Sequence, residues 1–169
     1  MKTNQDVLGD YNTFLDQIFT MFEELDMVVK IEEVDHLCYR VKTLADYQAK
    51  KLEFNEIGEL LIESMVNGRN ICTYKLHDPI VFKDKTIRLI ELPAPKNSHS
   101  YNNGLEHLEF VTKEPLQKIV DRHPHLMFET FGINKKINAD ITLKLGDYCI
   151  RFHNQSLDDV IKLEKRGRR

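Results

Sequence analysis

The sequence has few cysteines, no excess of basic residues and no long apolar run, and each of these absences argues against a class of protein. Three cysteines without Cys-x-x-Cys spacing argue against a disulfide framework or a cysteine zinc site. We expect them to be reduced core residues, namely Cys38, Cys72 and Cys149. Lys and Arg number 24 against 27 Asp and Glu, which argues against nucleic acid as the main partner.

No apolar run approaches the roughly 18 residues of a membrane-spanning helix, and no signal peptide is visible. We therefore expect no membrane contact and a cytoplasmic location. A nucleophile elbow, a phosphate loop and a dinucleotide fingerprint are also missing from the sequence. What remains is an ordinary globular composition, 41% hydrophobic and 30% charged over 169 residues, of a size that suits one compact domain.

The first segment predicts a helix. Apolar and aromatic residues recur at spacings of three and four from Leu8 to Leu25, with polar residues between them. Asn4 or Asp6 is placed to cap its start. We therefore expect an N-terminal amphipathic helix within residues 1–29 that packs on a sheet.

The rest of the chain predicts two modules with the same order of elements. In the first, residues 30–96, we expect a strand at 34–41, a helix at 43–57 and strands at 59–66, 71–76 and 86–92, with a turn at His77-Asp78-Pro79. In the second, residues 104–155, we expect a strand at 105–111, a helix at 115–122 and strands at 126–131, 139–145 and 148–153. A polar linker, 96–104, separates them, and residues 156–169 form a C-terminal helix and basic tail. The fold class is α+β, with two βαβββ modules forming a cupped mixed sheet.

A short motif opens both modules. Val34-Asp35-His36-Leu37-x-Tyr39 aligns with Leu105-Glu106-His107-Leu108-x-Phe110, 71 residues later. The repeat, together with the repeated element order, indicates an internal duplication. If the two opening strands lie side by side, both histidines point into one concave sheet.

The paired histidines predict a metal site, because imidazole is the commonest metal ligand near neutral pH. Two imidazoles leave a divalent ion under-coordinated, so we expect a carboxylate as well. The best candidate is Glu91, an acid within the apolar last strand of the first module. Glu109, on the His107 face of its strand, is the alternative. The predicted metal set is thus His36, Glu91 and His107.

These motifs resemble those of the vicinal-oxygen-chelate superfamily, which includes glyoxalase I, extradiol dioxygenases and bleomycin-resistance proteins. The chain closely resembles the YecM family within it, over roughly residues 30–155. The resemblance implies paired βαβββ modules around a divalent metal, with ligands from the first and last strands. The metal could be zinc, nickel, manganese, cobalt or iron.

One position departs from the glyoxalase pattern. In the last strand, Arg151 stands where a glyoxalase-type enzyme would place a second glutamate. The resemblance therefore implies a cation suited to an anionic substrate instead of the glyoxalase base. Arg40 is a second candidate anchor, although either arginine could instead pair with an acid such as Glu109. His153, on the Arg151 face, is a further candidate substrate-binding residue.

Two functions remain open. The protein could be an enzyme, a metal-dependent isomerase, lyase or dioxygenase acting on a small anionic molecule that offers two oxygens for chelation. It could also be a non-catalytic binding protein of the bleomycin-resistance type. Glu109 and Tyr39 are the only obvious general bases, so the sequence assigns no catalytic residue. A structural role, with the aromatic N-terminal helix as a docking face, is the third reading. Both a monomer and a homodimer are compatible with the sequence.

Overall fold

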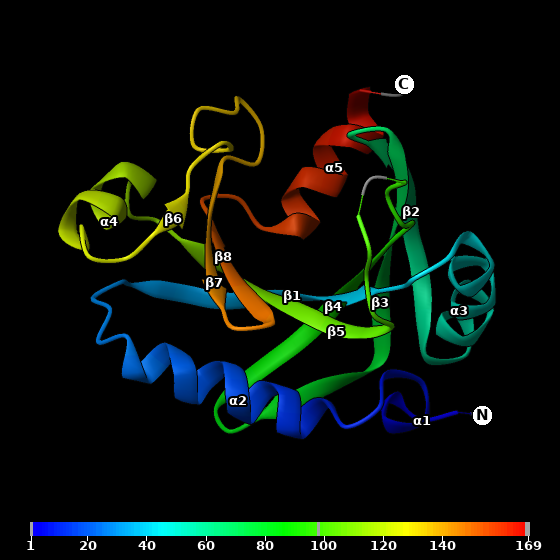
Figure 1. The fold of residues 1–169 in the computed structure, drawn as a ribbon. Coiled ribbons are helices and arrows are strands. Elements are labelled where there is room, and N and C mark those ends of the chain that lie inside the picture. The colour runs from blue at the N-terminus through cyan, green and yellow to red at the C-terminus, as the bar shows by residue number, and fades with distance from the viewer. Residues whose placement is uncertain (1, 98, 168–169) are drawn as a thin grey trace. The chain divides into compact units, whose positions relative to one another are not determined.

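The computed structural model describes residues 2–97 and 99–167, which form five helices and eight strands (Figure 1). Ser98 of the predicted linker and Arg168–Arg169 of the predicted basic tail lie outside the described residues. The chain divides into two compact units. Unit 1 comprises Met1–Phe14 and His36–Glu106, and unit 2 comprises Leu15–Asp35 and His107–Arg169.

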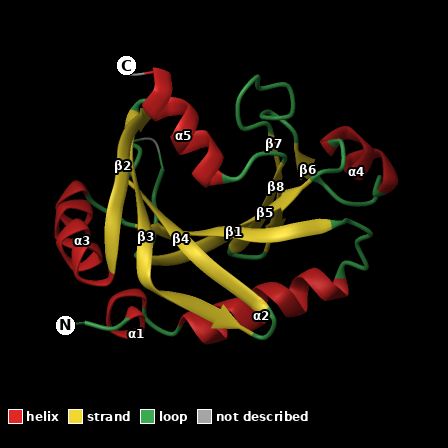
Figure 2. Cartoon of the chain, turned by 180° about the vertical axis from the view of Figure 1, so that it is seen from behind, coloured by secondary structure: helices red, strands yellow, loops and turns green. Residues whose placement is uncertain are grey.

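Unit 1 contains α1 (Asn4–Leu8), α3 (Leu44–Ile57), β2 (Gly58–Val66), β3 (Arg69–Phe82), β4 (Lys85–Pro93) and the second half of β1 (Ile31–Arg40). Its strands lie in the order β2-β3-β4-β1. β1 and β4 are parallel, while β3 is antiparallel to both β2 and β4. Figure 2 shows α3 running alongside β2.

Unit 2 contains most of α2 (Tyr11–Glu24), most of β5 (Gly104–Thr112), α4 (Leu116–Arg122), β6 (Phe128–Glu129), β7 (Asp140–Leu145), β8 (Tyr148–His153) and α5 (Leu157–Gly167). Its strands lie in the order β5-β8-β7-β6. β5 and β8 are parallel, and the other two pairs are antiparallel. Both units thus carry the same succession and pairing of elements, which confirms the predicted α+β class with two βαβββ modules and a mixed sheet.

Local signals account for α3. Thr43 is its N-cap and accepts a hydrogen bond from the Asp46 N–H, while the Asp46 carboxylate accepts from the Thr43 N–H. This reciprocal capping box satisfies two backbone donors that have no partner within the helix. Gly58 ends the helix, as predicted, and begins β2 directly.

The predicted continuous N-terminal helix is wrong in one respect, because the segment forms two helices. Gly9 separates α1 from α2 with a φ of 77°, a backbone conformation that side chains with a Cβ rarely adopt. The cap of α1 is also neither Asn4 nor Asp6. Thr3 takes that position, with Asp6 completing a capping box. A five-residue helix and a 14-residue helix therefore replace the single predicted helix.

Two strand predictions also need correction. The predicted strand at 126–131 is reduced to the two residues of β6. The predicted turn at His77-Asp78-Pro79 lies inside β3, which continues to Phe82. The register between β3 and β4 shifts between Lys75 and Ile80, so the proline falls at an irregularity. Such an irregularity tolerates a residue without an N–H donor.

Aromatic side chains form the core of unit 2. Phe22 of α2 stacks on Phe110 of β5 with ring centroids 5.6 Å apart, and Phe110 stacks on Phe152 of β8 at 5.5 Å. Phe19 meets Phe110 edge to face at 6.1 Å. Such pairs contribute about 0.5–1.5 kcal/mol each beyond the area they bury. The predicted packing of the aromatic stripe on a sheet is confirmed.

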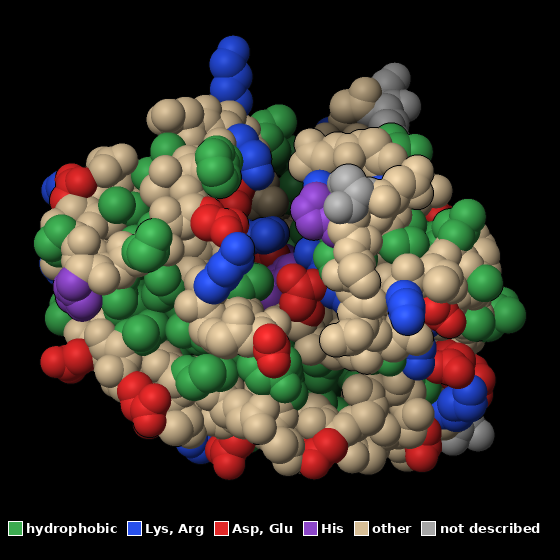
Figure 3. Space-filling view, in the orientation of Figure 1, with side chains coloured by type: hydrophobic (Ala, Val, Ile, Leu, Met, Phe, Trp, Pro, Cys, Tyr) green, Lys and Arg blue, Asp and Glu red, His purple; other side chains and the backbone are tan. Residues whose placement is uncertain are grey.

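The surface carries mixed charge. Acidic, basic and hydrophobic side chains are interspersed on the face drawn in Figure 3.

Among the helices of the described residues, none has the length and apolar character needed to cross a membrane.

One buried histidine of unit 2 has a structural role. His123 follows α4, donates from Nδ1 to the Ile119 carbonyl at 2.8 Å and accepts at Nε2 from the Val28 N–H at 3.0 Å. Both ring nitrogens are therefore used in joining α4 to the segment after α2.

His123→Ala should lower the free energy of unfolding by about 1–3 kcal/mol, because it removes the partner of the buried Ile119 carbonyl and of the part-buried Val28 N–H. Urea denaturation measures this change. The exposed neighbour His125 provides the matched control, since His125→Ala should change stability by less than about 0.5 kcal/mol. Equal effects of the two substitutions would contradict the structural role.

Candidate metal and anion site

One group of predicted site residues lies in unit 1. β1 and β4 run parallel with Cys38 opposite Glu91, and side-chain alternation places His36 and Glu91 on the same face. His36 Nε2 lies 3.7 Å from Glu91 Oε2. The His36 side chain is 2% exposed and the Glu91 side chain 16%. A buried imidazole and a largely buried carboxylate thus meet within one unit.

A separate group of predicted site residues lies in unit 2. His107 and Glu109 project from the same face of β5, and His107 Nε2 lies 3.0 Å from Glu109 Oε1. Both side chains are almost fully buried. A carboxylate that accepts a hydrogen bond from one imidazole nitrogen fixes the ring orientation, and raises the basicity of the other nitrogen toward a metal.

Glu109 also holds Arg151. The two residues are opposite each other in the β5–β8 register, and Arg151 Nη1 donates to Glu109 Oε1 at 2.9 Å. Arg151 Nε donates to Thr142 Oγ1 at 3.1 Å and lies 3.6 Å from an Asp140 carboxylate oxygen. The pairing with Glu109 that the sequence left open as an alternative is therefore present.

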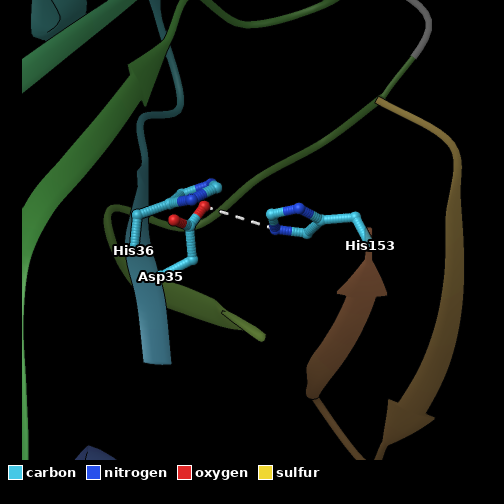
Figure 4. A group of neighbouring side chains, drawn as sticks. All are labelled: Asp35, His36 and His153. Carbon is cyan, nitrogen blue, oxygen red and sulfur yellow. Dashed lines mark ion pairs between the residues drawn. The ribbon is translucent and has the colours of Figure 1, made fainter. Parts of the chain in front are cut away.

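His153 lies between two carboxylates of unit 2. Its Nε2 is 3.3 Å from Asp35 Oδ2 and 3.4 Å from Glu109 Oε2, and its Nδ1 contacts the Gln155 carbonyl oxygen. Figure 4 shows the Asp35 carboxylate and the His153 ring facing each other. Asp35 also accepts the N–H of Leu157, the first residue of α5, at 3.0 Å. The sequence analysis did not predict Asp35 as a partner of His153. Its position next to His36, matched by Glu106 next to His107 in the second motif, was a signal that could have identified it.

Arg40, the last residue of β1, lies in unit 1. It pairs through Nε with Glu106, and its guanidinium carbon lies 5.1 Å from the centroid of the Tyr101 ring. Glu106 occupies the acid position of the second repeated motif. The acid that pairs with Arg40 is therefore Glu106, which the sequence had not singled out.

Cys149 departs from its predicted role as a core residue. It is half-buried, while Cys38 and Cys72 are fully buried, and all three are free thiols. Cys149 lies opposite His107 in the β5–β8 register. Its sulfur is within 4.8 Å of a His107 ring nitrogen, so it belongs to the surroundings of the candidate ligand.

The arrangement of strands and helices defines a class of protein. Solved structures of methylmalonyl-CoA epimerase share it, with TM-scores of 0.52 and sequence identities of 13–16% over 76% of this chain and 97–99% of theirs. One is a Streptomyces coelicolor epimerase variant in complex with 2-nitronate-propionyl-CoA. The chain therefore has the same fold as these epimerases, which is the fold that the resemblance to the vicinal-oxygen-chelate superfamily implied.

Within this class the chain belongs to the YecM family, whose model matches residues 3–164. It is 26% identical to Protein YecM of Escherichia coli K12 over 176 residues, covering 95% of this chain and 94% of that protein. An uncharacterized protein of Haemophilus influenzae is 30% identical over 177 residues, with 93% of each chain covered. A solved structure described as Protein EC4020 has a TM-score of 0.78 at 26% identity and covers 95% of this chain.

Proposed function

We propose that the protein binds a divalent metal ion through His36, Glu91 and His107 and acts on a small anionic molecule that chelates the ion. The observation that carries this proposal is the His36–Glu91 pair. Adjacent ligands about 2.1 Å from a common ion lie roughly 3.0–3.4 Å apart. The 3.7 Å between His36 Nε2 and Glu91 Oε2 is close to that spacing.

The donor set suits such an ion chemically. Two imidazoles and one carboxylate leave coordination positions open for a ligand. His107 would bind through Nδ1, because its Nε2 is engaged with Glu109, which then acts as the carboxylate that orients the ring. The proposal requires units 1 and 2 to contribute to one ion.

When bound, the metal supplies a Lewis acid for negative charge on substrate oxygen, or a site for dioxygen chemistry if it is iron. The protein's own residues would bind and orient the substrate. Arg151 offers a planar guanidinium on the face that carries Glu109, and His153 lies beside the same carboxylate. An anionic group could pair with Arg151 in a two-point contact. The first candidate function is thus an isomerase- or oxidoreductase-like enzyme.

A non-catalytic binding protein is the second candidate, and the state of the two possible bases favours it. Glu109 accepts from Arg151 and contacts two histidines, so it is not poised to take a proton from a substrate. Tyr39 packs edge to face on Phe54 with ring centroids 5.8 Å apart, beside the Lys50 ammonium. The Tyr39 ring is therefore part of the packing between β1 and α3 within unit 1. Turnover of substrate is the measurement that separates the two functions.

Metal analysis tests the metal directly. Protein purified without a chelator or a histidine tag should contain about one divalent ion per chain if the three ligands share one ion. Iron would favour oxygen chemistry, whereas zinc, nickel, manganese or cobalt would favour Lewis-acid chemistry. Failure to retain or to take up any of these ions would overturn the proposal.

The metal-loaded protein should bind small 2-oxo or 2-hydroxy acids in preference to neutral dicarbonyls. A ligand at a hundred times its dissociation constant stabilises the folded state by about 2.7 kcal/mol, which thermal denaturation detects. Arg151→Gln should remove most of that shift. Arg88→Gln, at an exposed position of β4, is the matched control and should retain it. Unchanged acid binding in Arg151→Gln would refute this role of the arginine.

A further inference from the structure

Three basic residues of unit 1 gather around the end of β4. Arg40 ends β1, Arg69 begins β3, and Lys96 follows β4 by three residues. β4 lies between β1 and β3, with Cys38 opposite Glu91 and Ile71 opposite Pro93. Side-chain alternation then places Arg40 and Arg69 on the face that carries His36 and Glu91. No sequence motif joins these three positions.

Both guanidinium groups have hydrogen-bonding capacity left over. Arg40 is only 9% exposed, and although its Nε pairs with Glu106, its buried Nη1 has no hydrogen-bond partner among the described residues. Arg69 donates from Nη1 to the Ala94 carbonyl at 3.3 Å, but its buried Nε has no partner within the described part of the chain. A buried donor without an acceptor costs about 1–3 kcal/mol, so two of them at one place indicate an acceptor that comes from outside the chain.

The local charge points to an anion. Burial lowers the pKa of Arg69, and the nearby Arg40 charge lowers it further. Burial also lowers the pKa of Lys96, and the charges of Arg69 and Arg40 add to the effect. The three cations are therefore close enough to repel one another. Glu106 supplies one compensating carboxylate, which leaves an excess of two positive charges in this cluster.

We propose that Arg40, Arg69 and Lys96 form a binding site for a phosphate group. A phosphate monoester carries a charge of about −1.5 to −2 at neutral pH, which matches the excess, and its oxygens can accept from donors that come from different strands. A carboxylate brings only one charge and lies in one plane. Tyr101, over which Arg40 lies, gives the site an aromatic wall.

The site extends the proposed function, since it shares the face of unit 1 that carries His36 and Glu91. The substrate would then bear a phosphate group as well as its chelating oxygens. That statement about the substrate rests on the proposed function. Phosphate binding itself does not, because the three basic residues can be examined in metal-free protein.

Calorimetric titration of inorganic phosphate into protein treated with a chelator tests the proposal. The wild type should bind phosphate, and Arg69→Gln and Lys96→Gln should each weaken binding about tenfold or more, which is the loss of one charge-assisted contact. Both substitutions are at partly exposed positions, whereas removal of the buried Arg40 risks unfolding. Arg88→Gln removes the same charge on the opposite face of β4 and should leave the affinity unchanged.

Further titrations identify the anion. Glycerol phosphate binding at least as tightly as inorganic phosphate supports a phosphate monoester, whereas inorganic phosphate alone supports a free-phosphate site. Acetate binding as tightly as either would overturn the choice of phosphate. Absence of phosphate binding, or an equal loss in Arg88→Gln, would overturn the site. Because metal uptake is measured separately, neither result would bear on His36, Glu91 and His107.

Discussion

His107→Gln should lower the affinity for zinc or manganese more than about 100-fold. Loss of a residue that merely orients a metal ligand costs about 10–100-fold, and loss of the ligand itself should exceed that. His36→Gln should have a similar effect. Glu91→Gln keeps the shape of the side chain but removes its negative charge, so it should cost at least about tenfold. Titration of metal into chelator-treated protein measures all three affinities.

The number of ions bound provides the sharper test. His36 and Glu91 belong to unit 1 and His107 to unit 2, so a shared ion predicts one ion per chain and a loss of the same affinity in all three variants. The control is His125→Gln, an exposed histidine that should not matter. Two ions per chain, each sensitive to one unit only, would refute a shared site. Unchanged affinity in Glu91→Gln would transfer the role of third ligand to Glu109.

Glu109→Ala should lower the free energy of unfolding by about 3–5 kcal/mol. This buried carboxylate accepts from Arg151 and also contacts His107 and His153. Its removal leaves the guanidinium with only the more distant Asp140 carboxylate and takes a partner from two buried imidazoles. Glu109→Gln should cost less, because the amide keeps the volume and an acceptor oxygen. Denaturation in urea without metal measures both changes.

A surface pair serves as the control for Glu109. Glu129 pairs with Lys144 at 2.9 Å, and both side chains are well exposed. Glu129→Ala should therefore cost at most about 1 kcal/mol. If Glu109→Ala were no more destabilising than Glu129→Ala, Glu109 would not be the buried centre of charge in unit 2.

Elements with strong local signals were predictable from the sequence. Thr43, Asp46 and Gly58 define the start and end of α3, and the repeated histidine motif locates β1 and β5. The break between α1 and α2 at Gly9 was harder to predict. The apolar spacing continues through this position, and only the backbone conformation of Gly9 reveals the turn. The length of β6 was overestimated, because two of the apolar residues that suggested a longer strand, Met127 and Phe131, are exposed to solvent.

The candidate site was predictable only in part. Strand alternation was enough to place Glu109 beside His107 and to raise the alternative that Arg151 pairs with Glu109. The pairing of Arg40 with Glu106 and of His153 with Asp35 depends on how distant segments pack, for which the sequence has no period. Arg69 and Lys96 were missed for the same reason. The ligand set His36, Glu91 and His107 stays a prediction.

Each unit combines two segments that lie far apart in the sequence, which affects how the chain folds during its synthesis. Phe19 and Phe22 of α2 belong to unit 2, but Phe110, on which both pack, lies far along the chain. At roughly 5–20 residues per second, the ribosome makes Phe110 about 5–20 s after Phe22. During that interval the aromatic rings of β5 and β8 on which α2 packs have not yet been made. The nascent chain thus carries an exposed hydrophobic segment that a chaperone could shield until β5 emerges.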